Sequence, residues 1–128
     1  MTIGVVGCGS FAQCFIPLFQ AHPLVGEVVL CDLDEVKLAE SAAKYRIART
    51  YSSLEAVLET DIEAVAIFTQ NWLHGPQAVQ ALRAGKQVYS AVPAGIAVEE
   101  IEDLVQAVKQ SGRIYMLGET SYYYPGTI

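Results

Sequence analysis

The chain has 128 residues, 52% of them hydrophobic and 17% charged, with a formal net charge of −6. This length allows one domain with a sizeable core, and the acidic balance excludes a basic face for nucleic acid. No apolar run approaches the roughly 18 residues of a membrane span, and the N-terminus shows no signal pattern. We therefore expect a cytoplasmic protein with neither nucleic-acid nor membrane partners.

Residues 2–34 form the most informative stretch of the chain. An apolar run at residues 3–6 ends at Gly7-Cys8-Gly9-Ser10-Phe11-Ala12. A helical pattern then continues to residue 22, and a second apolar run at residues 28–31 ends on Asp32. This order predicts a strand, a glycine turn, a helix, a second strand and an acid, which is the arrangement of a dinucleotide-binding unit.

Each part of the turn suits a pyrophosphate. Gly7 allows the chain to leave the strand in a tight turn, and Gly9 has no Cβ, so the phosphates can approach the backbone. Ala12 stands where a third glycine usually sits and is small enough for helix and strand to pack closely. The unpaired donors at the helix start are the backbone N–H groups of Ser10, Phe11 and Ala12.

Asp32 bears on the choice of cofactor. It is predicted to accept hydrogen bonds from the adenosine ribose hydroxyls. A 2′-phosphate at about 4 to 5 Å would cost on the order of 3 to 4 kcal/mol at an effective dielectric of about 20. Asp34 adds a second negative charge, and no Arg follows Asp32 to receive a phosphate. The sequence therefore predicts NAD rather than NADP.

The rest of the chain continues the alternation of strands and helices. Strands are predicted at residues 48–51, 64–68, 87–90 and 114–117, and helices at residues 33–44, 52–58, 73–84 and 98–110. Asp34 is a predicted N-cap, Ser52 and Glu55 have capping-box spacing, and Gly85 is a predicted left-handed stop. These elements predict an α/β fold with a doubly wound parallel six-stranded sheet of order 3-2-1-4-5-6 and helices on both faces.

The three cysteines, Cys8, Cys14 and Cys31, are odd in number and lack metal-ligand spacing, so no metal site is predicted. We interpret them as small, reduced residues that fill space within the nucleotide unit. The alternative is that Cys8 is a reactive thiol at a helix N-terminus.

Two later stretches identify a family. They are Thr69-Gln70-Asn71-Trp72-Leu73-His74 and Ala81-Leu82-Arg83-Ala84-Gly85-Lys86-Gln87-Val88, which leads to Pro93. With the opening turn and Asp32, they resemble the N-terminal half of the Gfo/Idh/MocA family, named after glucose-fructose oxidoreductase, inositol dehydrogenase and MocA. The resemblance implies a dehydrogenase for sugars, cyclitols or related polyols, with a Rossmann domain followed by a domain that carries the substrate site and the oligomer interface.

The resemblance also implies roles for individual residues and for parts of the chain. It places Thr69, Gln70 and Asn71 beside the nicotinamide ribose, with His74 near it and Pro93 in the next loop. For His74 the alternative is a polar helix-start residue without chemistry. Residues 1–118 would form the dinucleotide-binding domain, and residues 119–128 would begin the connection to a substrate domain. A homo-oligomer is expected, and the chain alone is expected to bind cofactor without turnover.

One position departs from the family. The family's Glu-Lys-Pro aligns on Ala91-Val92-Pro93, so the expected lysine is Val92, which cannot carry a proton. No catalytic residue is therefore assigned, and a non-catalytic NAD-sensing or scaffolding relative stays open. A third interpretation, an S-adenosylmethionine-dependent methyltransferase, shares the glycine turn and the acid. Tyr122, Tyr123 and Tyr124 are expected to pack against a second domain or to line a substrate pocket.

Overall fold

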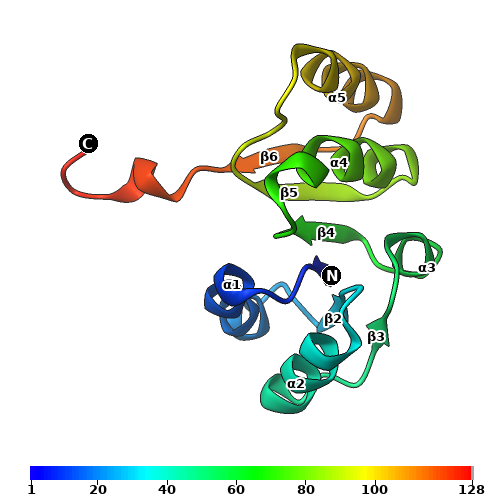
Figure 1. Cartoon of the computed structure of the whole chain (residues 1–128), viewed down its shortest axis with the longest axis vertical. Helices are drawn as coiled ribbons and strands as arrows, with labels where there is room; N and C mark the ends of the chain where they lie inside the picture. Colours follow the sequence, from blue (N-terminus) through cyan, green and yellow to red (C-terminus); the bar gives the residue numbers. More distant parts are fainter. Residues whose placement is uncertain (128) are drawn as a thin grey trace.

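A computed structural model describes residues 1–127 (Figure 1). Its parallel sheet has six strands in the order β3-β2-β1-β4-β5-β6, which confirms the predicted fold class and strand order. The strands are β1 (Thr2–Val6), β2 (Glu27–Cys31), β3 (Thr50–Tyr51), β4 (Ala64–Ile67), β5 (Gln87–Ala91) and β6 (Tyr115–Gly118). The helices are α1 (Ser10–Ala21), α2 (Glu35–Tyr45), α3 (Leu54–Leu58), α4 (His74–Arg83) and α5 (Val98–Ser111), with 3₁₀ turns η1 (Asn71–Leu73) and η2 (Thr120–Tyr123).

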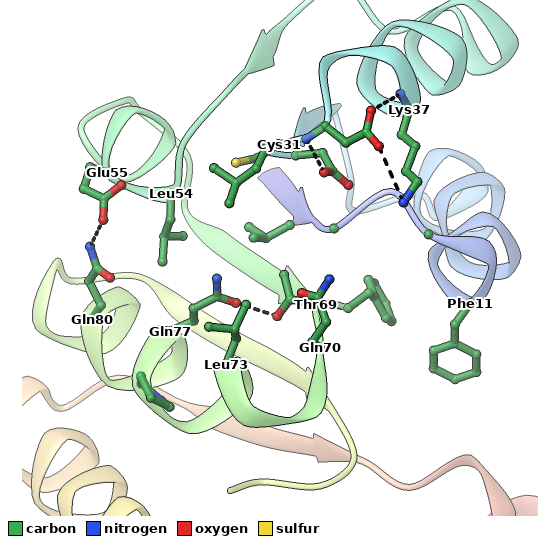
Figure 2. Close-up of a pocket in the computed structure, with 18 of the residues that line it drawn as sticks. Phe11, Cys31, Lys37, Leu54, Glu55, Thr69, Gln70, Leu73, Gln77 and Gln80 are labelled. Atoms are coloured by element: carbon green, nitrogen blue, oxygen red, sulfur yellow. Dashed lines mark hydrogen bonds and ion pairs between the residues drawn. The ribbon is translucent and has the colours of Figure 1, made fainter.

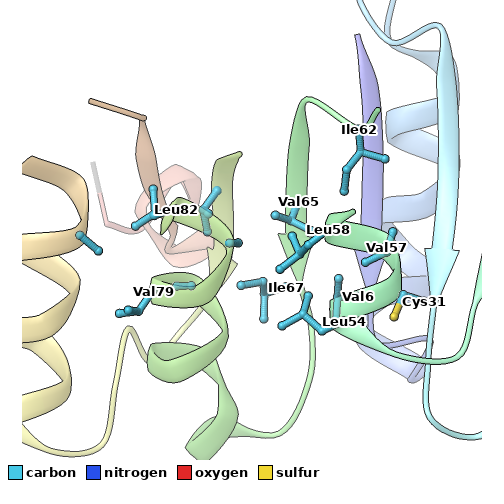
Figure 3. Packing of buried hydrophobic residues seen from close by; sticks show 14 of the residues in the cluster. Val6, Cys31, Leu54, Val57, Leu58, Ile62, Val65, Ile67, Val79 and Leu82 are labelled. Atoms are coloured by element: carbon cyan, nitrogen blue, oxygen red, sulfur yellow. The ribbon is translucent and has the colours of Figure 1, made fainter. Parts of the chain in front are cut away.

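The sheet separates two hydrophobic clusters, because consecutive residues of a strand point to opposite faces. Val6 lies in the cluster beneath α3, α4 and α5 (Figure 3), whereas Val5 lies in the cluster beneath α1 and α2. Both side chains are almost completely buried. Helices therefore cover both faces of the sheet, which explains why its strands are apolar runs rather than alternating patterns.

Local caps set the helix boundaries. Asp34 is the N-cap of α2, as predicted, and its Oδ1 accepts hydrogen bonds from the backbone N–H groups of Val36 and Lys37, both at 3.1 Å. This cap makes α2 begin at Glu35 rather than at residue 33. Gly85, after α4, has the predicted left-handed conformation with φ of 81°.

The predicted capping box of Ser52 and Glu55 is wrong. Helix α3 begins at Leu54, and Ser53 is its N-cap, with its Oγ accepting from the N–H of Ala56 at 3.2 Å. The sequence offers two adjacent serines, and the path of the chain leaving β3 brings the second one into the capping position.

The third strand is shorter than the predicted residues 48–51. Only Thr50 and Tyr51 pair with β2. Arg49, just before them, bonds Glu27 at 2.8 Å and Asp61 at 2.7 Å, so this edge of the sheet is also held by side chains. Within residues 1–127, no helix has the length and apolar character needed to span a bilayer.

The carboxyl ends of β1, β2 and β4 lie side by side, because β1 pairs with β2 on one edge and with β4 on the other. The chain leaves β1 for α1 on one face of the sheet and leaves β4 for α4 on the opposite face (Figure 1). The loops that follow these strands therefore diverge, and a crevice opens where the strand order reverses.

Candidate functional site

A pocket of about 750 Å³ occupies this crevice (Figure 2). Its volume is within the range of small-molecule and cofactor sites. Seven of the eleven predicted site residues line it: Gly7, Gly9, Ser10, Phe11, Asp32, Thr69 and Gln70. The other four, Ala12, Asn71, His74 and Pro93, are not among its lining residues in the described chain. The structure therefore brings together the glycine turn, the acid after β2 and the loop after β4.

Gly7 is required by the backbone of the turn. Its φ is +92°, and a Cβ there would lie 2.8 Å from the carbonyl carbon and oxygen of Phe68. The N–H of Gly7 donates to the carbonyl oxygen of Cys31 at 2.8 Å. The turn is thus fixed against both neighbouring strands, β2 and β4, and has little freedom to move.

Gly9 faces open space. A Cβ at this position would meet no atom within 4 Å, although the residue lines the pocket. Gly9 is also the N-cap of α1, and no side chain caps this helix in the part of the chain that the structure describes. A helix start without a side-chain cap leaves backbone N–H donors for an anion, and the missing Cβ lets that anion approach them. These residues fit a pyrophosphate.

Asp32 is held against the turn by two backbone groups. Its Oδ2 accepts from the N–H of Cys8 at 2.7 Å, and its Oδ1 accepts from the N–H of Asp34 at 2.8 Å. A carboxylate accepts more than one hydrogen bond per oxygen, so both oxygens keep capacity for a ligand hydroxyl. Asp32 lines the pocket and is only partly buried.

The wall of the pocket formed by α4 contains two polar residues that sequence reasoning missed, Gln77 and Gln80. Thr69 Oγ1 donates to Gln77 Oε1 at 2.6 Å, and Gln80 Nε2, one helical turn later on α4, donates to Glu55 Oε1 at 3.0 Å (Figure 2). Lys37 on α2 also lines the pocket. The spacing of Gln77 and Gln80 could have revealed a polar face of α4, but not that this face meets the glycine turn.

His74 lies at the start of α4, directly after the loop that follows β4. Its side chain is 1% exposed, and its ring nitrogens contact two carbonyl oxygens, with Nδ1 2.9 Å from Pro93 and Nε2 2.8 Å from Thr69. The ring thus joins the loop after β4 to the loop after β5. In the described structure His74 is the first residue of α4, and its buried ring connects these two loops.

Burial decides between the two interpretations of Cys8. Its side chain is 4% exposed. Burial, with a smaller contribution from the nearby Asp32 charge, raises the pKa of Cys8 to about 11. The thiol is therefore protonated at neutral pH, which supports the space-filling interpretation rather than a reactive thiol.

Comparison with known families shows which family the chain belongs to. Residues 1–119 match the Gfo/Idh/MocA description "Oxidoreductase family, NAD-binding Rossmann fold". The chain belongs to the Gfo/Idh/MocA oxidoreductase family. The match includes the glycine turn, Asp32 and the loops after β4 and β5, and it does not support the methyltransferase interpretation.

Several relatives of this Gfo/Idh/MocA chain are known. An uncharacterized oxidoreductase of Synechocystis sp. is 32% identical over 111 residues, covering 86% of this chain and 30% of that protein. A glycosyl hydrolase family 109 protein of Saccharopolyspora erythraea is 32% identical over 123 residues, covering 87% of this chain and 26% of that protein.

Among solved structures, the WlbA dehydrogenase of Bordetella pertussis, in complex with NADH and UDP-GlcNAcA, superposes with a TM-score of 0.89. It is 26% identical, and the match covers 95% of this chain and 36% of that one. The chain therefore spans less than half the length of each of these three proteins.

The resemblance to the family predicts a lysine at position 92, where this chain has Val92. Val92, which stands in its place, is 41% exposed, and the Val92–Pro93 peptide bond is cis. Pro93 keeps its place in the loop, and its carbonyl oxygen contacts His74. A valine side chain offers no proton and no charge, so no acid or base is assigned at this position.

Proposed function

We propose that the pocket binds NAD, with the pyrophosphate on the glycine turn and the adenosine ribose on Asp32. Three features that occur together carry this proposal. A Cβ at Gly9 would meet no atom, helix α1 starts there without a side-chain cap, and the Asp32 carboxylate is hydrogen-bonded to the adjacent Cys8. When bound, the cofactor would supply a hydride acceptor or donor. The chain's own residues would bind it and orient it.

The two ends of the cofactor would contact different loops. Gly7, Gly9, Ser10, Phe11 and Ala12 form the phosphate end. The nicotinamide ribose is placed beside the loop after β4, at Thr69, Gln70 and Asn71. His74 and Pro93 would act on this end indirectly, because the His74 ring links the carbonyl groups of Thr69 and Pro93.

NAD is proposed over NADP because of the charges around Asp32. A 2′-phosphate at about 4 to 5 Å from this carboxylate would be repelled by roughly 3 to 4 kcal/mol at an effective dielectric of about 20. Because Asp32 is partly exposed, we take this energy as an upper figure.

For the protein as a whole we propose hydride transfer between NAD and an alcohol carbon of a sugar, cyclitol or related polyol. Residues 1–118 would form the cofactor domain, and residues 119–128 would begin the connection to a substrate domain, since the known relatives are longer. The described chain would then bind cofactor without turnover, because positioning of the substrate supplies a large part of catalysis. A homo-oligomer and a cytoplasmic location complete the proposal.

Val92 favours a second candidate, in which NAD is not consumed. A protein without a proton carrier at this position could sense NAD or act as a scaffold. A reaction without net oxidation would also leave NAD unconsumed, and one relative, from Saccharopolyspora erythraea, is named a glycosyl hydrolase family 109 protein. The dehydrogenase and the second candidate differ in whether reduced cofactor accumulates.

Calorimetric titration tests cofactor binding. We expect the chain to bind NAD more tightly than NADP and to show no binding of S-adenosylmethionine. Tighter binding of S-adenosylmethionine than of NAD would overturn the assignment. A panel of sugars and polyols with the full-length protein separates the two candidates: NADH formation supports the dehydrogenase, whereas tight NAD binding without NADH formation supports the second candidate.

A further inference from the structure

Glu100 has a different environment from its acidic neighbours on α5. Its side chain is partly buried, whereas those of Glu99, Glu102 and Asp103 are exposed. Glu100 lies in the first turn of the helix, and its Oε2 accepts a hydrogen bond from the backbone N–H of Ile96 at 2.8 Å. The carboxylate therefore fixes the end of the loop after β5 to the start of α5.

Two glycines make room for this side chain between α4 and the loop. Helices α4 and α5 lie side by side on one face of the sheet (Figure 1). A Cβ at Gly75, on α4, would lie 3.1 Å from Glu100 Oε2, and a Cβ at Gly95, in the loop, would lie 2.9 Å from the same atom. Neither glycine has a positive φ, so the close approach of Glu100 is what favours glycine at both positions. Either added carbon would force the Glu100 side chain to shift.

The loop that Glu100 holds is connected to the pocket through His74. The carbonyl oxygen of Pro93 is 2.9 Å from His74 Nδ1, and the carbonyl oxygen of Thr69 is 2.8 Å from His74 Nε2. Thr69 lines the pocket, and Gly75 directly follows His74 at the start of α4. Glu100 therefore lies against both the loop and the helical turn that hold the His74 ring. A continuous series of contacts leads from Glu100 to the loop after β4.

We propose that Glu100 is a positioning residue for the nicotinamide half of the cofactor. It holds the loop after β5 against α4 and, through His74, sets the position of the loop after β4. This inference rests on the proposed function, because it assumes that the nicotinamide ribose lies beside Thr69, Gln70 and Asn71. Glu100 is not among the pocket-lining residues of the described chain, so it acts without touching the cofactor.

The other half of the cofactor should not depend on Glu100. In the proposed function the adenosine ribose and the pyrophosphate lie on Asp32 and the glycine turn, which are not part of this series of contacts. ADP contains the adenosine and two phosphates but lacks the nicotinamide and its ribose. A change confined to the nicotinamide half should weaken NAD and leave ADP unchanged, whereas partial unfolding should weaken both by the same factor.

The experiment measures the Kd values of NAD and ADP by calorimetry for the wild-type chain, Glu100→Ala, Glu100→Gln and Glu99→Ala. In Glu100→Ala we expect the Kd for NAD to rise about tenfold and the Kd for ADP to change less than about twofold. Glu100→Gln keeps an oxygen that can accept from the N–H of Ile96, so its Kd for NAD should stay within about threefold of the wild type. Glu99→Ala removes a charge from the same helical turn without removing this contact and should match the wild type for both ligands.

Gly95→Ala provides a second variant, which displaces the carboxylate without removing it. The new Cβ would lie 2.9 Å from Glu100 Oε2 and 3.1 Å from Ile101 Cδ1. We expect the same selective loss of NAD affinity as in Glu100→Ala. Circular dichroism checks that each variant is folded, and if Glu100→Ala is not, Gly95→Ala decides by the same comparison of NAD with ADP.

Each other result contradicts the inference in a distinct way. Wild-type NAD affinity in a folded Glu100→Ala chain, or equal losses for NAD and ADP, overturns the role of Glu100 while cofactor binding stands. A wild-type chain that binds ADP as tightly as NAD also overturns it, since the nicotinamide half would then contribute nothing. If the wild type binds neither ligand, the proposed function itself fails.

Discussion

The Asp32 carboxylate accepts a 2.7 Å hydrogen bond from the backbone N–H of Cys8, 24 residues earlier in the chain. This contact ties the acid at the end of β2 to the glycine turn at the end of β1. One side chain therefore shapes the phosphate site and faces the pocket. The two features that the sequence suggested separately form a single structural unit.

Asp32→Asn should weaken NAD binding about 10-fold to 100-fold, because hydrogen bonds to a charged group contribute about 1.5 to 3 kcal/mol. NADP should lose less affinity than NAD, since repulsion of the 2′-phosphate is also removed. Calorimetry with both cofactors measures the two changes. Asp103→Asn, an exposed position on α5, is the matched control. Equal losses for the two cofactors would contradict the predicted contact with the ribose.

Gly9→Val should separate binding from folding. The new side chain would meet no protein atom at its Cβ, so the free energy of unfolding should change by less than about 1 kcal/mol. It would, however, occupy the space proposed for the pyrophosphate, and NAD affinity should fall at least about tenfold. Gly126→Val, where a Cβ is equally unobstructed, should change neither quantity. Normal NAD binding by Gly9→Val would show that the phosphates lie elsewhere.

His74→Leu should destabilise the chain by roughly 2 to 4 kcal/mol, because it leaves the partly buried carbonyl groups of Thr69 and Pro93 without their contacts to the ring. Urea unfolding followed by circular dichroism measures the loss. His22→Leu removes an exposed ring just after α1 and should cost much less. Equal stability of the two variants would mean that the His74 contacts do not hold the loops together.

The buried thiols predict a loss of stability at alkaline pH. Burial raises the pKa of Cys8 from 9.0 to about 11 and the pKa of Cys31 from 9.0 to about 12. Because the thiol pKa is higher in the folded chain than in the unfolded chain, the protonated thiol contributes its full stabilisation at pH values below the unfolded-state pKa. It is lost as the pH rises from about 9 through 11 and 12, because the unfolded chain releases its protons first.

The measurement is the free energy of unfolding between about pH 8 and pH 11. Over this range the free energy of unfolding of Cys8→Ala should fall less than that of the wild type, by a difference of at most about 3 kcal/mol. Cys14→Ala, at an exposed position, should follow the wild-type curve. A Cys8→Ala curve with the wild-type slope would show that this thiol does not contribute to the alkaline loss.

The region after β6 predicts self-association. Tyr122 and Tyr123 are each 68% exposed and Tyr124 is 61% exposed, beside the partly exposed Met116 and Leu117. Figure 1 shows this segment extending away from the sheet. Exposed apolar groups that lie together usually contact a partner, so light scattering should show association that increases with concentration. The double variant Tyr122→Ser/Tyr123→Ser should remain monomeric, and a monomeric wild type at high concentration would refute the prediction.

The sequence by itself determined the layout of the fold and half of the site. Gly7 can be read locally, because a tight turn out of a strand favours φ > 0, and Asp34 can be read as a cap from its position before a helical pattern. Apolar runs separated by helices specify a covered parallel sheet, and right-handed crossovers then fix the strand order. The prediction that Ser52 caps α3 was wrong because Ser52 and Ser53 are both residues that favour the N-cap position.

Only the tertiary structure decided which distant side chains meet. Lys37 and Gln77 lie on helices that cover opposite faces of the sheet, yet both line one pocket at its carboxyl edge. His74 is buried because the loops after β4 and β5 are brought together by strand pairing. Such contacts join residues far apart in the chain, and no periodicity or spacing encodes them. They depend on the sheet that all six strands form together.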